Sequence, residues 1–371
     1  MRMKAPMAPV LRRVFGGSLV YVGAIAVAAA VSASFIVAMH GDVLVAFRTI
    51  VISSLGSFSG IAQTLNKICP LLLGSFAVML GMRGGFVNIG VDGQIYLGAI
   101  AATGIGFALA DTGLPAAVMV PALLLAGTLG GAAFGAIPGA LRACWGVNEI
   151  FVTVMLNFVA YYLTEYLSSG PWNDPVSGEA ISVPIPDEAT LPMLMPRAGA
   201  HSGILLAVLV AILVWWLLSH TVFGYEIRAV GANPRAARAG GISIPWITFM
   251  TLSLSGALAG LAGAIEVSGY HNRLILGLTP GYGVIAILIA FLGGKSVGGV
   301  AVAAILVSIL MVGADSLQRS VGLPASAGFV FQAIVVLCVL LVEAHSARRR
   351  GSRTMPHESP RLKSPPSPPR G

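Results

Sequence analysis

Residues 223–242 read FGYEIRAVGANPRAARAGGI and form a polar stretch between two long apolar runs. Asn233 is a typical helix N-cap residue, because its side-chain oxygen can accept hydrogen bonds from the first backbone N–H groups, and Pro234 suits the first helical position. Residues 235–239 are favourable helix formers, and the Gly-Gly pair that begins at Gly240 is typical of a helix end. The stretch therefore predicts a helix of about two turns, which is too short to be stable without a surface to pack against.

This predicted helix combines small side chains with positive charge. Ala236, Ala237 and Ala239 suit close docking against another surface. Arg235 and Arg238 lie about one helical turn apart and suit contact with acidic groups. Two interpretations follow from these residues: an ordinary basic loop at the cytoplasmic face of a membrane, or a helix that docks on a partner.

The two flanking apolar runs belong to a strongly hydrophobic chain. Of its 371 residues, 56% are hydrophobic and only 10% are charged, whereas a soluble domain carries about 25% charged residues. Several runs reach the roughly 20 residues that span a bilayer as a helix. The basic residues that give the net charge of +8 flank these runs, as in membrane topology signals. The composition predicts an all-α polytopic membrane protein that contacts lipid, with no role in nucleic-acid binding.

We expect about ten transmembrane helices in this chain. The first apolar run follows several basic residues, as in a signal peptide, but it exceeds the roughly 7–15 residues of a cleaved segment, so we expect it to be retained. The eighth run is short and ends in Gly-Gly-Lys, so we expect it to be tilted, broken or incompletely inserted. The predicted spans are residues 18–39, 62–81, 88–110, 116–141, 149–168, 202–220, 244–267, 282–293, 297–316 and 325–343.

The basic residues also predict the orientation of these spans. With a cytoplasmic N-terminus, all but five of the 22 basic residues fall on the cytoplasmic side, which predicts that both termini are cytoplasmic. The five exceptions are Arg48, Lys67, Arg197, Arg273 and Arg319.

The chain then divides into three parts by composition and charge. Residues 1–17 form a basic cytoplasmic N-terminus, and residues 18–346 form the membrane domain. Within that domain we expect an external loop at 169–201 and a cytoplasmic loop at 221–243. Residues 347–371 are rich in Pro, Ser and Arg with almost no apolar content, which predicts a disordered cytoplasmic tail.

Several polar side chains lie in otherwise apolar spans. Asn88, Asp92 and Gln94 belong to the third predicted span, where polar groups should face a cavity or another helix. One interpretation is that Asn88 and Gln94 line a solute pathway. The other is that these residues fix a sharp helix entry, with Asp92 near the cytoplasmic interface.

The fifth span repeats this question. Asn148 followed by Glu149 is typical of a helix N-terminus, since an amide caps the first turn and a carboxylate favours the helix dipole. Asn157 lies deeper in the span and is the stronger pathway candidate. Glu165 and Glu266 lie near predicted outer ends, where we expect both to be solvated.

Glycines at a spacing of four residues predict close helix packing. Gly127, Gly131 and Gly135 share one face of the fourth span, and Gly256 and Gly260 repeat the pattern on the seventh. Such faces let helix backbones approach closely. The contact is expected within the protomer or between subunits.

No motif in the sequence predicts catalysis. Gly294, Lys295 and Ser296 match the end of a phosphate-binding loop, but Ile289 occupies the place of the required first glycine and no strand precedes it. The three cysteines and six histidines show no metal-like spacing. We therefore predict a non-enzymatic chain without an ATP site, a metal site or a cofactor.

Three stretches resemble permease subunits of bacterial ABC importers. Residues 224–242 are similar to the coupling loop that docks on the ATPase subunit in the ribose and branched-chain amino-acid permease superfamily. Residues 84–98 (GGFVNIGVDGQIYLG) and 146–157 (GVNEIFVTVMLN) resemble the nucleoside importers of this superfamily, which work with a basic-membrane-protein type binding lipoprotein. The resemblance covers about residues 63–343.

The resemblance implies an assembly as well as a fold. The fold would consist of two related halves of opposite topology that flank residues 169–243. The partners would be an ABC ATPase, with two fused nucleotide-binding domains, a second permease subunit and an extracytoplasmic substrate-binding lipoprotein. The assembly would lie in the bacterial plasma membrane, with Asn233 to Gly240 as its coupling helix.

Two alternatives to a nucleoside importer stay open. The same machinery could carry sugars or branched-chain amino acids, although the signature around Asn88 argues against it. An ion-coupled secondary transporter is the other alternative. Such proteins usually hold charges in the middle of the membrane, whereas we expect the ionisable groups of this chain near the ends of its spans.

Overall fold

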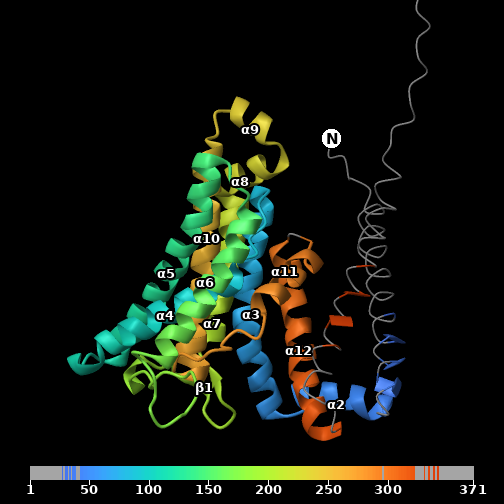
Figure 1. Cartoon of the computed structure of the whole chain (residues 1–371). Coiled ribbons are helices and arrows are strands. Elements are labelled where there is room, and N and C mark those ends of the chain that lie inside the picture. The colour runs from blue at the N-terminus through green and yellow to red at the C-terminus, as the bar shows by residue number, and fades with distance from the viewer. Residues whose placement is uncertain are drawn as a thin grey trace, which may run out of the picture. The chain divides into compact units, whose positions relative to one another are not determined.

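The computed structural model describes residues 42–294 and 296–321, together with scattered helical positions at 27–38 and 330–341 (Figure 1). Residues Ser34–Gln332 form one compact unit, to which every contact below belongs. The predicted N-terminal segment and C-terminal tail lie outside the described residues, as does most of the first and tenth predicted spans.

The described ranges contain seven helices that are long and apolar enough to cross a membrane. This confirms the prediction of an all-helical polytopic membrane protein. The long helices are α3 (Phe58–Gly84), α4 (Val91–Ala108), α5 (Ala116–Trp145), α6 (Glu149–Ser169), α7 (Gly203–His220), α10 (Ile244–Ile265) and α12 (Val297–Val321).

Shorter elements connect these helices. A π-helical turn, η3 (Glu266–His271), continues α10. The remaining elements are α2 (Val43–Leu55), α8 (Val222–Ala232), α9 (Pro234–Ala239), α11 (Tyr282–Leu292), two 3-10 turns η1 (Ala110–Thr112) and η2 (Asp187–Ala189), and an antiparallel strand pair β1 (Met193–Met195) and β2 (Ala200–His201).

The eighth predicted span is α11, a helix of 11 residues. At 1.5 Å per residue it covers about half of a hydrocarbon core that is ~30 Å thick. The predicted shortness of this element is therefore confirmed, whereas its insertion stays a prediction. The helix stops at Gly293, and Gly294 follows with a φ of 60°, a left-handed conformation that glycine adopts without strain.

Glycines bring the backbones of α5 and α10 into contact. A Cβ atom on Gly131 would overlap the carbonyl oxygen of Gly256, and a Cβ atom on Gly127 would lie 2.9 Å from the carbonyl oxygen of Gly98 in α4. Gly135 likewise leaves no room for a side chain beside Leu252. The face formed by the glycines of α5 thus packs within the protomer.

The long helices differ in how much of their surface is buried. Of the apolar stretch of α3, 89% is buried inside the protein, whereas only 17% of the apolar stretch of α6 is buried. Large apolar side chains of α6 and α7 such as Phe151, Tyr162 and Trp216 are exposed. Exposed apolar faces of this kind are typical of helices that contact lipid or another subunit.

The two ends of this unit carry different structures. Figure 1 shows α9 at one end of the helices and β1 at the opposite end. At the β1 end, Trp172 packs edge-on against Phe107. Oγ of Ser182 accepts from the N–H of Leu274 at 2.9 Å, and the N–H of Ser182 donates to the carbonyl oxygen of Leu274 at 2.9 Å. The segment between α6 and α7 is therefore an ordered cover over one end of the helices.

Candidate functional site

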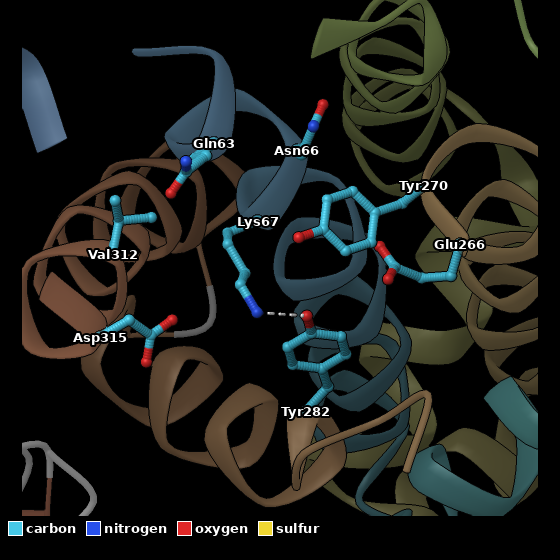
Figure 2. A pocket seen from close by; sticks show the side chains of 8 residues that line it. All are labelled: Gln63, Asn66, Lys67, Glu266, Tyr270, Tyr282, Val312 and Asp315. Atoms are coloured by element: carbon cyan, nitrogen blue, oxygen red, sulfur yellow. Dashed lines mark hydrogen bonds between the residues drawn. The ribbon is translucent and has the colours of Figure 1, made fainter. Parts of the chain in front are cut away.

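A polar cavity of about 170 Å³ lies among α3, η3, α11 and α12 (Figure 2). Every side chain that lines it except one, a valine, carries a hydrogen-bonding group. In hydrocarbon such groups are costly unless they are paired or face water or a solute. The lining residues are Gln63, Asn66, Lys67, Glu266, Tyr270, Tyr282, Val312 and Asp315.

Lys67 extends from α3 into the cavity. Its Nζ donates a hydrogen bond of 3.0 Å to Oη of Tyr282 and lies 5.3 Å from the centroid of the same ring. Figure 2 shows Asp315 on one side of the Lys67 side chain and Tyr270 and Glu266 on the other. The ammonium group therefore lies between acidic side chains from two different elements.

Glu266 contributes a buried carboxyl group, with an exposed fraction of only 2%. Its Oε2 lies 3.6 Å from Nε2 of His271. The prediction that Glu266 is solvated is wrong, because η3 extends α10 past the expected span end and keeps position 266 inside the protein. Glu266 and Lys67 both lie within helices that are long and apolar enough to cross a membrane. Single π-helical turns often occur at functional sites.

Asn66 connects this cavity to the segment between α6 and α7. Its Nδ2 donates to the carbonyl oxygen of Gly199 at 2.8 Å, and its Oδ1 accepts from the N–H of His201 at 3.2 Å. In Figure 2 its amide points away from the cavity. One wall of the cavity is thus hydrogen-bonded to the β2 strand.

His201 itself is buried beside the cavity wall. Its Nδ1 accepts from the N–H of Gly203 at 3.1 Å, and its ring packs against Gly269. Its Nε2 has no hydrogen-bond partner in the described structure. Because burial disfavours the charged form, the pKa of His201 falls from 6.5 to about 4.

The predicted pathway residues Asn88 and Gln94 lie together in a different place. Nδ2 of Asn88 donates to Oε1 of Gln94 and to Oγ of Ser255, both at 2.8 Å. Ser255 in turn donates to the carbonyl oxygen of Ala77 at 2.6 Å. All three side chains are buried, so this network joins α3, α4 and α10 and does not line the polar cavity.

Asn157 is separate from that network. Its Oδ1 accepts from the N–H of Gly93 at 2.8 Å, and its Nδ2 donates to the carbonyl oxygen of Ile89 at 2.9 Å. The amide therefore satisfies backbone groups at the start of α4. Both of its polar atoms are engaged in this structure, which favours a packing role over solute contact.

The neighbouring polar residues fix helix ends. Asn148 accepts from the N–H of Ile150 at 2.9 Å and caps α6, as predicted. Oε2 of Glu149 lies 2.7 Å from Nη1 of Arg142 at the end of α5. Asp92 accepts from the N–H of Gly283 at 2.7 Å, and so joins the first turn of α4 to the start of α11.

At the other end, α8 and α9 form a hairpin whose turn is Asn233. The side-chain oxygen of Asn233 accepts from the N–H groups of Arg235 at 3.1 Å and Ala236 at 3.2 Å. Pro234 occupies the first helical position, and the N–H of Gly240 closes the helix against the carbonyl oxygen of Ala236. The predicted short helix and its caps are confirmed.

An open groove of about 410 Å³ lies between α8 and α9. Ala236 lines it and is exposed, whereas Ala237 has an exposed fraction of 5% and belongs to the hydrophobic core. The expectation of one free alanine face is therefore wrong for Ala237, because the short helix uses that side chain to pack on its own protein. Arg235, Arg238 and Ala239 are exposed.

The residues that line the polar cavity were not predicted as a site from the sequence, although the sequence contains a signal for them. Gln63, Asn66 and Lys67 recur at helical spacing within an apolar run, which places them on one face of α3. The distribution of basic residues counted Lys67 on the outer side, within the predicted span 62–81. Its partners Glu266 and Tyr282 lie about 200 residues further along the chain, and only tertiary packing brings them to α3.

The family model described as "Branched-chain amino acid transport system / permease component" matches residues 60–340. The chain belongs to this family. It is accordingly a multi-pass membrane permease of an ABC importer and not an ATPase. Importers of this kind work with ATPase and binding-protein partners. Within the described residues, no group of three or more His, Cys, Asp or Glu side chains is placed to hold a metal ion.

Similar permeases have different named solutes. The permease is 35% identical to the glucose ABC transporter permease protein TsgB13 of Haloferax volcanii over 87% of each chain. It is 33% identical to the guanosine permease NupP of Bacillus subtilis, over 76% of this chain and 82% of NupP. It is 30% identical to the nucleoside permease NupB of Lactococcus lactis, over 79% of this chain and 82% of NupB. No solved structure matches.

Proposed function

We propose that this permease imports nucleosides as one transmembrane subunit of a bacterial ABC importer. The proposal is supported by the signature at residues 84–98 and by the similarity to permeases named for guanosine and nucleosides. ATP hydrolysis on separate subunits would drive the transport, since the chain has no phosphate-binding loop.

Sugar import is the second candidate, because a glucose permease is 35% identical over most of the chain. Guanosine and glucose share one chemical part, a sugar ring with several hydroxyl groups. A pathway that recognises this ring would suit either solute. The family membership disfavours the third alternative, an ion-coupled secondary transporter.

The observation that carries the proposal is the polar cavity inside an apolar helical protein. Lys67 and Glu266 place ionisable groups within spans where such groups mark solute pathways. Solutes with several hydroxyl groups need hydrogen-bond partners as they leave water. The cavity supplies such partners, whereas Asn88, Gln94 and Asn157 are satisfied by the protein itself.

The proposed assembly has two permease subunits, and the resemblance to nucleoside importers favours two different chains. The ATPase, with two fused nucleotide-binding domains, would bind at the cytoplasmic end through α9. A binding lipoprotein would deliver the solute at the opposite end. This arrangement requires cytoplasmic termini, about ten spans and two halves of opposite topology in the plasma membrane, with residues 169–201 outside.

Uptake by the reconstituted importer tests this function. The permease would be co-expressed with its genomic neighbours and reconstituted in proteoliposomes that contain ATP. We expect uptake of labelled guanosine and uridine that exceeds uptake of glucose and leucine and depends on ATP. Uptake of glucose in preference to nucleosides would establish the second candidate, and uptake of leucine alone would contradict both.

A further inference from the structure

We propose that the cavity around Lys67 binds the hydroxyl groups of a neutral, sugar-containing solute during its passage through the permease. The inference rests on the proposed function and names the part of the solute that the membrane subunit recognises. It moves the solute site from the residues that the sequence suggested to a cluster on α3, η3, α11 and α12.

The cavity offers both hydrogen-bond donors and hydrogen-bond acceptors, which suits a ligand with hydroxyl groups. Lys67 can donate, and the carboxyl oxygens of Glu266 and Asp315 can accept. Neighbouring hydroxyl groups each donate and accept, so a sugar ring can satisfy both kinds of partner at once.

A tyrosine already occupies the place that a ligand hydroxyl would take. The Oη atom of Tyr282 accepts from Lys67 at 3.0 Å. A solute hydroxyl has the same hydrogen-bonding capacity, so exchange of one for the other loses no hydrogen bond at the ammonium group. The rings of Tyr282 and Tyr270 offer apolar surfaces for the carbon face of a sugar.

The size of the cavity limits which part of the solute it holds. Its volume of about 170 Å³ is smaller than the roughly 300–1,000 Å³ of pockets that enclose a whole ligand. Such a space suits a single hydroxylated ring, and the base of a nucleoside would extend beyond it. We therefore expect the permease to recognise the sugar and to tolerate different bases.

Protection of a cysteine in the cavity wall tests the site directly. Gln63 is exposed and lines the cavity, so Gln63→Cys would be labelled with a methanethiosulfonate reagent after the three native cysteines are replaced by alanine. In the assembled importer we expect guanosine and D-ribose to slow labelling several-fold. Free guanine and 2′,3′-dideoxyguanosine should leave the rate unchanged. Val176→Cys, on the segment between α6 and α7, is the control that no solute should protect.

A second arm removes the carboxyl group of Glu266 from the site. Glu266→Gln, added to Gln63→Cys, should raise the guanosine concentration for half protection several-fold, as for loss of one hydrogen bond. Glu165→Gln makes the same change on α6, away from the cavity, and should leave that concentration unchanged. Abundance and the basal ATPase rate would show that each variant assembles.

The outcomes separate this inference from the proposed function. If the parent imports nucleosides but neither guanosine nor D-ribose protects Gln63→Cys, the sugar site is wrong and the function stands. The site is also wrong if guanine protects as well as guanosine, or if Glu266→Gln changes nothing. If the parent imports neither nucleosides nor glucose, the function fails, and protection by D-ribose in the assembled importer still decides the site.

Discussion

Gly231 in α8 lies so close to Arg83 at the end of α3 that a Cβ atom on Gly231 would overlap the Arg83 carbonyl oxygen. The two helices lead to different parts of the permease: α3 carries Lys67 into the polar cavity, and α8 continues through Asn233 into α9. Their backbone contact is therefore a physical connection between the α9 end and the cavity.

The substitution Gly231→Ala tests that connection. Its Cβ atom would separate α8 from α3, since the nearest atoms are backbone and cannot turn aside. We expect uptake to fall several-fold while the ATPase still co-purifies with the variant. Gly298→Ala is the matched control, because a Cβ atom there meets nothing within 4 Å. Equal uptake by both variants would show that this contact transmits nothing.

Helix ends and the short loop helix could be predicted from sequence because their causes are local. Asn148 and Asn233 cap α6 and α9 as their sequence context indicates. The seven long helices follow from the length of apolar runs. The first and tenth predicted spans lie mostly outside the described residues, so the total of about ten spans stays a prediction.

The polar cavity could not be predicted in the same way, because its parts come from distant segments. A sequence pattern shows that Asn88 or Lys67 is polar within an apolar run, but not which partner satisfies it. Asn88 meets Ser255, which is 167 positions away, whereas Lys67 meets Tyr282, 215 positions away. The first pair is enclosed by three helices, and the second faces a cavity.

Replacement of Asn157 by leucine distinguishes a packing role from a pathway role. The change leaves the N–H of Gly93 and the carbonyl oxygen of Ile89 without their partners. One unsatisfied buried group costs about 1–3 kcal/mol. We expect a lower thermal midpoint in detergent and a loss of uptake in proportion to abundance. Strongly reduced uptake at parental stability and abundance would instead place Asn157 on the solute pathway.

The burial of His201 predicts that stability depends on pH. Its pKa falls from 6.5 to about 4 on folding, so the unfolded chain binds the proton more tightly. This contribution is fully present above about pH 6.5 and is lost as the pH falls toward 4, on the order of 3 kcal/mol in total. Thermal midpoints between pH 7.5 and 4.5 should fall less steeply in His201→Asn than in the parent. Equal pH dependence of the thermal midpoint in the two proteins would show that His201 does not cause the loss of stability.

The orientation of the permease can be tested with single cysteines. Ser177 lies in the segment between α6 and α7, which we expect outside, and Ser346 follows the tenth predicted span, which we expect to end inside. In a background without the native cysteines, Ser177→Cys should react with an impermeant thiol reagent in intact cells. Ser346→Cys should react only after the cells are lysed. Labelling of both in intact cells would rule out ten spans with cytoplasmic termini.

The proposed coupling role of α9 can be tested at two adjacent alanines. Ala236 is exposed in the groove between α8 and α9, so Ala236→Asp should leave the fold and abundance of the permease unchanged. If the ATPase covers this surface, the new carboxylate is buried without a partner, at a cost of about 3–5 kcal/mol. That corresponds to more than about a hundredfold in the association constant, so the ATPase should no longer co-purify and uptake should be lost.

The adjacent residue supplies the contrast that makes this test specific. Ala237 is buried within the permease, so Ala237→Asp should lower its abundance before any partner is involved. Ala236→Ser is small and neutral and should retain both uptake and the ATPase. Parental uptake by Ala236→Asp at equal abundance would show that this side of α9 is not docked, and α9 would then serve only to close the connection between α8 and α10.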